Sequence, residues 1–98
     1  MVSPLRFHPL LVDDLKSATD WYDRLSTLLG DRFRASIDQS FDSVASYAES
    51  FAIVFDEVRA ARVKRFPYLL LFEIHPSAVH VIGLFHTASD PRKWKARL

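Results

Sequence analysis

The chain has 98 residues, of which 49% are hydrophobic and 26% charged, a composition that suits one globular domain spanning residues 1–98. It contains no cysteine, which excludes disulfides and thiolate metal sites. The formal net charge of +1 hides a division: residues 1–58 carry five Lys/Arg and ten Asp/Glu, a net −5, whereas residues 59–98 carry eight and two, a net +6.

The division of charge has two interpretations. The basic half suits a polyanion or an acidic protein partner, because a strong local field favours association with the opposite charge. Alternatively, the two halves complement each other within the fold. No apolar run approaches the roughly 20 residues that a membrane helix needs, and the first residues lack the layout of a signal peptide. We therefore expect a cytoplasmic protein without a membrane partner.

Two amphipathic helices are predicted between residues 9 and 48, because apolar residues recur there at spacings of three and four. Pro9 suits the first turn of the first helix, Gly30 its left-handed C-cap, and Asp31 the N-cap of the second helix. The short joint predicts an antiparallel helical hairpin, with both apolar stripes packed on a sheet. The stripes are Leu11, Leu15, Ala18, Tyr22, Leu25 and Leu29, then Phe33, Ile37, Phe41, Val44 and Ala48.

From residue 51 onward, short apolar stretches separated by turn residues are typical of strands. The expected order is β-α-α-β-β-β, an α+β fold with the hairpin on one face of a mainly antiparallel sheet of three to four strands. Asp90-Pro91 predicts a helix cap and a first-turn proline that open a short basic tail. We expect strands at residues 58–65, 68–74 and 79–85, an edge strand at residues 5–8, and either a strand or an extended link at residues 51–55.

Four basic residues, Arg59, Arg62, Lys64 and Arg65, lie within seven positions. Alternation along a strand would place Arg62 and Lys64 on one face and Arg59 and Arg65 on the other. Arginines on an open sheet face bind phosphates in bidentate fashion or hold an acidic protein segment. The alternative is a solvated edge strand that charge keeps soluble.

A second basic cluster surrounds Trp94 near the C-terminus and consists of Arg92, Lys93, Lys95 and Arg97. A tryptophan among cations can stack on a base or anchor a protein interface. It can also fold back and seal the edge of the core, which is the interpretation we favour.

Three histidines bear on possible chemistry. His86 ends the last expected strand, where it fits either a general acid or base in RNA cleavage or a polar strand end without catalytic duty, which we favour. His75 and His80 do not fall at metal-ligand spacing, and two glycines cannot build a phosphate-binding loop. We therefore expect no metal and no cofactor.

Several short motifs occur in a fixed order along nearly the whole chain. They are Phe7-His8-Pro9, Asp14-Leu15, Trp21-Tyr22, Leu29-Gly30-Asp31-Arg32-Phe33, Val58-Arg59, Arg65-Phe66-Pro67-Tyr68, His86, and Asp90-Pro91 with Trp94. Each motif alone is a weak signal, whereas the ordered set is specific. The set resembles the RelE/ParE toxin superfamily of type II toxin–antitoxin systems, and more closely its ParE branch.

The resemblance implies a small bacterial toxin that inhibits growth. Such a toxin is neutralised by a cognate antitoxin, which is acidic, partly disordered when free, and usually encoded beside it. ParE-like members poison DNA gyrase without being nucleases, whereas RelE-like members cut messenger RNA on the ribosome. Cutting would use Arg59, Arg62, Lys64 and His86 around the phosphate. The C-terminal tyrosine of many such nucleases is missing here, because residues 94–98 are Trp-Lys-Ala-Arg-Leu.

The resemblance therefore favours a non-enzymatic gyrase poison. A ribosome-dependent mRNA endonuclease and a non-toxic protein-binding module of the same fold are the alternatives. The expected target- or antitoxin-binding residues are Arg59, Arg62, Lys64, Arg65, Arg92, Lys93, Trp94, Lys95 and Arg97.

Overall fold

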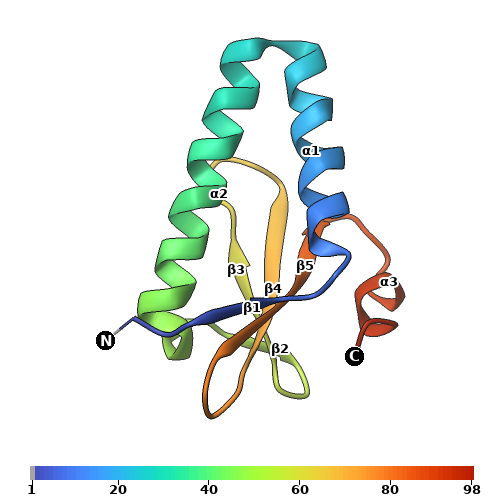
Figure 1. Ribbon diagram of the computed structural model, residues 1–98. Coiled ribbons are helices and arrows are strands. Elements are labelled where there is room, and N and C mark those ends of the chain that lie inside the picture. The colour runs from blue at the N-terminus through green and yellow to red at the C-terminus, as the bar shows by residue number, and fades with distance from the viewer. Residues whose placement is uncertain (1) are drawn as a thin grey trace.

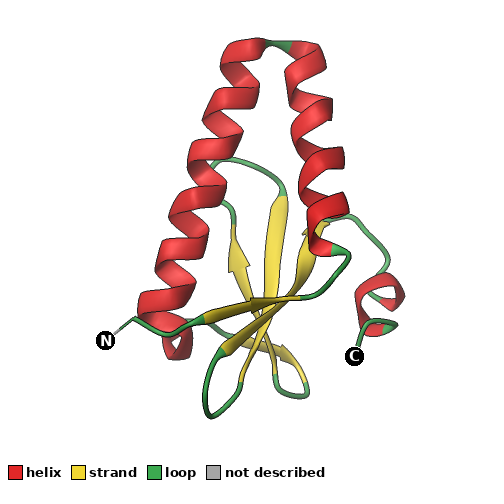
Figure 2. Cartoon of the chain, viewed as in Figure 1, coloured by secondary structure: helices red, strands yellow, loops and turns green. Residues whose placement is uncertain are grey.

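The computed structural model describes residues 2–98 and packs a long helical hairpin on one face of a five-stranded sheet (Figure 1). The turn of the hairpin projects beyond the sheet, and a short helix lies near the C-terminus (Figure 2). Within the described residues, no helix is long and apolar enough to cross a membrane. The elements are β1 (Leu5–Phe7), α1 (Leu11–Leu25), α2 (Thr27–Tyr47), the 3-10 turn η1 (Ala48–Ser50), β2 (Ile53–Phe55), β3 (Val58–Arg62), β4 (Tyr68–Ile74), β5 (Val79–His86) and α3 (Arg92–Lys95).

The strand order in the sheet is β1-β5-β4-β3-β2, with β1 parallel to β5 and the other neighbours antiparallel. The predicted α+β fold and helical hairpin are confirmed. The sheet has five strands rather than three or four, because Ile53 and Phe55 of β2 pair with Arg59 and Val58 of β3. The extended link considered for residues 51–55 is therefore wrong, and the last three of those residues form an edge strand.

The joint between the two helices lies at Ser26, earlier than the sequence predicts. Ser26 has extended backbone angles (φ −171°, ψ 134°), and its side chain accepts a hydrogen bond from the Leu29 N–H as the N-cap of α2. The predicted C-cap at Gly30 and N-cap at Asp31 are therefore wrong, because both residues lie inside α2. A Cβ atom on Gly30 would stand 1.7 Å from Asp23 Oδ1 of α1. Glycine at this position therefore leaves room for the Asp23 carboxylate beside α2.

Most members of the two predicted apolar stripes pack against the sheet. Leu25 is an exception and is 60% exposed, because it lies at the end of α1 where the hairpin projects beyond the sheet (Figure 1). α1 also begins at Leu11, so Pro9 precedes the helix instead of occupying its first turn. The buried members are Leu11, Ala18, Phe33, Ile37, Val44 and Ala48, and the partly buried ones are Leu15, Tyr22, Leu29 and Phe41.

Phe66 and Tyr68, which enter β4, pack against aromatic rings of the hairpin. The ring centroid of Phe66 lies 4.9 Å from that of Tyr22 on α1 and 4.9 Å from that of Phe33 on α2. Tyr68 lies 5.4 Å from Phe33, and burial raises the pKa of the Tyr68 hydroxyl above its usual value. The Phe-Pro-Tyr motif therefore joins the start of β4 to both helices.

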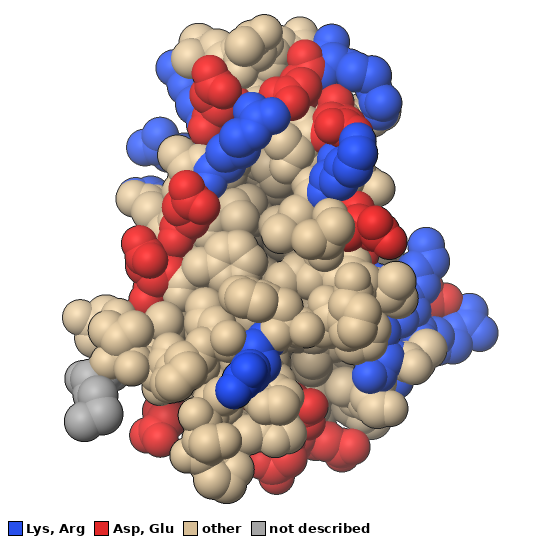
Figure 3. All heavy atoms as spheres, in the orientation of Figure 1, with Lys and Arg blue, Asp and Glu red and all other residues tan. Residues whose placement is uncertain are grey.

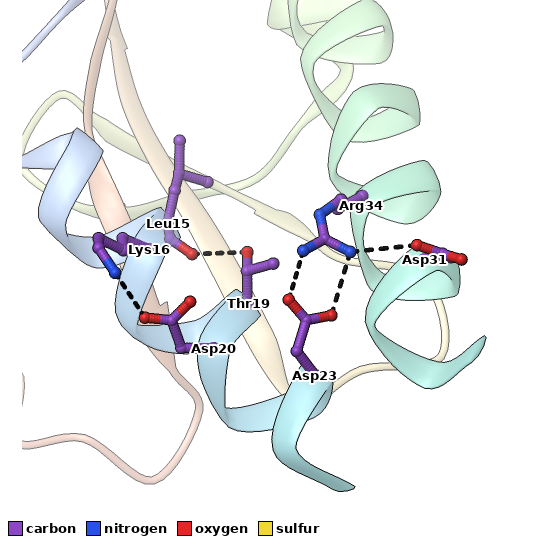
Figure 4. Close-up of polar contacts among 7 residues, drawn as sticks. All are labelled: Leu15, Lys16, Thr19, Asp20, Asp23, Asp31 and Arg34. Carbon is purple, nitrogen blue, oxygen red and sulfur yellow. Dashed lines mark hydrogen bonds and ion pairs between the residues drawn. The ribbon is translucent and has the colours of Figure 1, made fainter. Parts of the chain in front are cut away.

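Ion pairs connect the helices on the outer surface of the hairpin (Figure 4). Arg34 of α2 is bidentate to Asp23 of α1 and also contacts Asp31 at 3.2 Å. The hydrogen bonds to Asp23 raise the pKa of Arg34 above its usual value. Lys16 pairs with Asp20 one turn along α1, at 2.7 Å. Exposed pairs of this kind contribute little to stability, and of these pairs only Arg34–Asp23 links the two helices.

The sheet face opposite the hairpin carries a second, smaller core. In the β4–β5 pair, Leu71 pairs with Gly83 and Phe72 with Val81, so Ile82 has no partner and β5 contains a bulge. The extra residue directs Ile82 to this face, whereas Val81 packs with the hairpin core. The buried members of the second core are Val58, Leu71, Ile82 and Trp94.

Candidate functional site

Arg59, near the start of β3, is bound to the main chain that follows α2. Its Nη1 atom donates to the carbonyl oxygens of Glu49 at 3.1 Å and Phe51 at 2.8 Å. A guanidinium is suited to this task because its donors are arranged as a rigid fork. Arg59 thus connects η1 to the sheet, which is a role that the charge pattern did not predict.

The other three basic residues of the first cluster lie at the end of β3 and in the turn that follows it. β3 ends at Arg62, three residues before the predicted boundary. Arg65 has a positive φ of 70°, so the chain turns there instead of remaining extended. The predicted alternation therefore applies to Arg59 and Arg62 only, and Lys64 and Arg65 are presented by the turn.

These three cations line a groove between α2 and the end of β3, which we call the basic groove. It consists of two adjoining hollows of about 410 and 450 Å³ that share Ser36, Gln39 and Lys64. Arg62 lines the first hollow and Arg65 the second. The structure therefore brings together three of the four residues in the first predicted cluster. The main residues of the groove are Arg32, Ser36, Gln39, Ser40, Arg62, Lys64 and Arg65.

Arg32 of α2 also lines the basic groove, and sequence reasoning missed it. It precedes Ser36 by one turn and Gln39 by two turns, so the three residues share one face of α2. This polar spacing beside the apolar stripe is the signal that could have found it. Among the described residues, no carboxylate forms an ion pair with any of the groove's four cations.

The second basic cluster begins where the chain leaves β5. Pro91 is the N-cap of α3, and the Asp90 carboxylate accepts hydrogen bonds from the Arg92 N–H at 2.9 Å and from its guanidinium at 2.6 and 2.8 Å. These bonds hold the pKa of Asp90 below its usual value. Asp90 therefore orients the start of α3, although it precedes the N-cap by one residue.

Trp94 of α3 covers the second core and is only 8% exposed. The interpretation that it seals the edge of the core is therefore confirmed. Lys95 lies with its Nζ atom 4.1 Å from the ring centroid of Phe55 in β2, a cation–π arrangement. Lys93 is exposed, and Lys and Arg side chains gather on the side of the molecule where α3 lies (Figure 3).

Arg97 connects the C-terminal segment to the start of α1. Its Nη1 and Nη2 atoms donate to the two carboxylate oxygens of Asp14 at 2.6 and 2.8 Å, and Nη1 also donates to the Ile82 carbonyl at 3.2 Å. The Leu84 N–H donates to the same carboxylate at 3.1 Å. The guanidinium lies over the Phe85 ring at 4.6 Å. The hydrogen bonds to Asp14 raise the pKa of Arg97 above its usual value. The part-buried contacts with Asp14 and the Ile82 carbonyl give this cation a structural role.

His86 lies apart from the basic groove. Its Nδ1 atom accepts a hydrogen bond from the Ala88 N–H at 2.9 Å, and its ring lies edge-on to Tyr68 at 5.3 Å. It lines a third hollow of about 290 Å³ between β2 and α3, whereas Arg62 and Lys64 line the basic groove. The structure thus does not gather the four residues that the sequence assigned to RNA cleavage.

His75 and His80 flank the β4–β5 turn with their rings stacked at 3.9 Å. His75 Nε2 lies 3.8 Å from a carboxylate oxygen of Glu73. Within residues 2–98, no group of three or more His, Cys, Asp or Glu side chains is arranged to hold a metal ion.

Comparison with known proteins identifies the family. A family model described as ParE toxin of type II toxin-antitoxin system, parDE, matches residues 5–91. The chain belongs to the ParE toxin family. A chain of the solved structure titled "Chromosomal ParDE TA system from P. aeruginosa" superposes with a TM-score of 0.75 and is 16% identical, covering 87% of this ParE-family chain and 96% of that chain.

At this identity, the structural likeness establishes a shared fold. No curated protein matches the sequence of this ParE-family chain. The resemblance drawn from the ordered motifs is confirmed, and membership of a type II toxin–antitoxin family implies a cognate ParD antitoxin as partner.

Proposed function

We propose that this ParE-family toxin inhibits growth by poisoning DNA gyrase in the cytoplasm and that it does not cut RNA. The distribution of the four candidate nuclease residues supports the proposal. Arg59 binds main-chain carbonyls, and Arg62 and Lys64 line the basic groove, whereas His86 lines the hollow beside α3. A general acid or base must reach the reacting proton while the cations hold the phosphate. Their separation favours a binding function.

Binding to the target and to the antitoxin is assigned to the exposed cations on two surfaces. One surface is the basic groove, and the other is the outer side of α3. Arg59, Trp94 and Arg97 support these surfaces from within, because their side chains are buried or already paired. The exposed residues assigned to binding are Arg62, Lys64, Arg65, Arg92, Lys93 and Lys95.

The proposal is tested with purified toxin in a gyrase supercoiling reaction. The toxin is expected to block supercoiling of relaxed plasmid, and the same toxin saturated with its antitoxin is expected to have no effect. His86→Ala serves as a discriminating variant, because a gyrase poison retains its activity without this side chain.

The competing functions give different results. A ribosome-dependent endonuclease would leave gyrase unaffected and produce cuts in translated messages, and Arg62→Ala or His86→Ala would abolish these cuts. A non-toxic binding module would be harmless when overexpressed without antitoxin. Either result would overturn gyrase poisoning.

A further inference from the structure

A hollow beside β1, at the edge of the sheet remote from the basic groove, belongs to neither of the two binding surfaces described above. It has a volume of about 390 Å³ and is formed by the end of β1, the start of β5 and the turn that precedes β5. Among the described residues that line it, none is acidic. We call it the histidine hollow, and its polar side chains are Arg6, His8, Ser77 and His80.

The strand register brings the basic side chains of the hollow to one face of the sheet. Arg6 of β1 and His80 of β5 are partners in the parallel pair. Their neighbours Leu5 and Val79 pack with the hairpin core, so Arg6 and His80 point away from the hairpin. His8 follows Arg6 by two residues and lines the same hollow. The topology thus gathers one arginine and two histidines that come from opposite parts of the sequence.

Hydrogen-bond donors are available on these side chains. The His8 Nδ1 atom accepts a hydrogen bond from the Leu10 N–H at 3.1 Å, so the neutral ring carries its proton on Nε2, where it can donate to a ligand. Arg6 is exposed, and within residues 2–98 no carboxylate forms an ion pair with it. Ser77 adds an exposed hydroxyl from the turn.

The ring of His80 is oriented by residues outside the hollow. It stacks on the ring of His75 with 3.9 Å between the centroids. His75 Nε2 in turn lies 3.8 Å from a carboxylate oxygen of Glu73. Glu73 is the β4 partner of His80, which places it two strands, or about 10 Å, from Arg6. This acid therefore contacts His75 and leaves the charge of Arg6 uncompensated.

We propose that the histidine hollow binds a phosphoryl group and that the DNA held by gyrase supplies it. Arg6 donates to the two non-bridging oxygens of a phosphodiester, and His8 and His80 add donors from their rings. Phosphodiester oxygens are acceptors only, which suits a hollow that offers donors and no carboxylate. The choice of DNA rests on the proposed function, whereas the phosphoryl site itself does not.

The position of the hollow favours a polymer over a free phosphate ion. Arg6 and His80 lie on the sheet face that α3 covers through Trp94. Arg97, just beyond α3, donates to the Ile82 carbonyl, and Ile82 follows His80 by two residues, roughly 7 Å along β5. A backbone with successive phosphates can therefore contact the hollow and the exposed cations of α3 together, whereas a single ion reaches only one of them.

The site is tested by nuclear magnetic resonance of the histidine rings during a titration with inorganic phosphate at fixed pH and ionic strength. The signals of His8 and His80 are expected to shift and saturate with phosphate, and to stay in place in chloride of the same ionic strength. Arg6→Gln is expected to raise the apparent dissociation constant at least about tenfold, because it removes charge-assisted hydrogen bonds.

Arg24→Gln is the matched control for this titration. It removes an exposed cation of α1 that lies over the Trp21 ring, outside the hollow, so it is expected to bind phosphate normally. Circular dichroism verifies that both variants are folded.

The source of the phosphoryl group is tested by binding to a short fluorescent DNA duplex, without gyrase, over a range of salt concentrations. Loss of one phosphate contact in Arg6→Gln is expected to reduce the slope of log K against log salt by about 0.9, and to weaken binding roughly eightfold at about 0.1 M salt. Arg24→Gln is expected to keep the slope of the unaltered toxin.

The outcomes separate this inference from the proposed function. Histidine signals that ignore phosphate, or normal phosphate binding by Arg6→Gln, overturn the site. Saturable phosphate binding with an unchanged salt slope overturns DNA as the source and assigns the hollow to a free phosphate or phosphate ester. Weaker binding of Arg6→Gln to the antitoxin, with an unchanged salt slope, assigns the hollow to an acidic protein segment and also overturns the proposal. A toxin that shows both expected effects but leaves supercoiling unaffected overturns the proposed function and leaves the phosphoryl site standing.

Discussion

The Asp14–Arg97 pair joins residues 83 positions apart, and its removal is expected to loosen the C-terminal segment. Asp14→Ala deletes a carboxylate that accepts two hydrogen bonds from Arg97 and one from the Leu84 N–H. The Arg97 guanidinium would then retain only the Ile82 carbonyl and the Phe85 ring as partners.

The size of the effect follows from the burial of the pair. Removing one partner of a buried ion pair costs about 3–5 kcal/mol, because an uncompensated charge remains. The two side chains retain 13% and 12% exposure, so some water reaches them and the lower end applies. We expect Asp14→Ala to lower the free energy of unfolding by about 3 kcal/mol. The total free energy of unfolding of a domain of this size is roughly 5–15 kcal/mol, so this loss is a large part of it.

Urea unfolding of the wild type, Asp14→Ala, Arg97→Ala and the double variant measures the coupling directly. The double variant is expected to lose less stability than the two single losses combined, by about 2 kcal/mol. A coupling energy below about 0.5 kcal/mol would show that the pair contributes no more than an exposed one, and would refute the argument from burial.

Three further changes test other parts of the structure. Gly83→Ala should lower the urea midpoint by an amount equivalent to about 2 kcal/mol, because its Cβ would lie 2.4 Å from Arg97 Nη1; an unchanged midpoint would contradict this close approach. Trp94→Ala should lower the free energy of unfolding by about 3 kcal/mol in the same assay, and Trp94→Phe should lower it less. No loss with Trp94→Ala would show that the second core does not contribute to stability. The hydrogen bonds from Arg92 lower the pKa of Asp90 below its usual value of 3.8. Their contribution to folding stability is therefore complete at pH values above 3.8 and is lost as the pH falls through the lower pKa of the folded state. The difference in unfolding free energy between wild type and Asp90→Asn should therefore vanish in acid. A difference that grows as the pH falls would contradict the prediction.

The sequence predicts a secondary-structure element well where its residues are buried along its whole length. It predicts the boundary of an element less well where a single local contact sets that boundary. The β4 strand runs from Tyr68 to Ile74, as the apolar run predicts, because both of its faces are covered. Gly30 resembles a C-cap in the sequence, but the helix is interrupted four residues earlier, where the Ser26 backbone is extended and its hydroxyl caps α2. The apolar period continues across this break, so spacing alone could not reveal it.

The candidate site illustrates a second limit of sequence patterns. The charge run at the end of β3 correctly marked Arg62, Lys64 and Arg65 as neighbours, because they are close in sequence. Arg32 lines the basic groove only because α2 packs beside the end of β3, and this packing cannot be read from sequence spacing. The same reasoning treated Arg97 as a surface cation, because its partner Asp14 lies at the other end of the chain.

The central claim, that this ParE-family toxin poisons gyrase, is tested most directly by the fate of DNA in a purified gyrase reaction. The reaction is stopped with detergent and protease, and linear plasmid is quantified with and without the toxin. We predict that linear DNA accumulates in proportion to free toxin and disappears when the antitoxin is added. Plasmid that stays fully supercoiled at saturating toxin, from a preparation that arrests growth in cells, would contradict the claim.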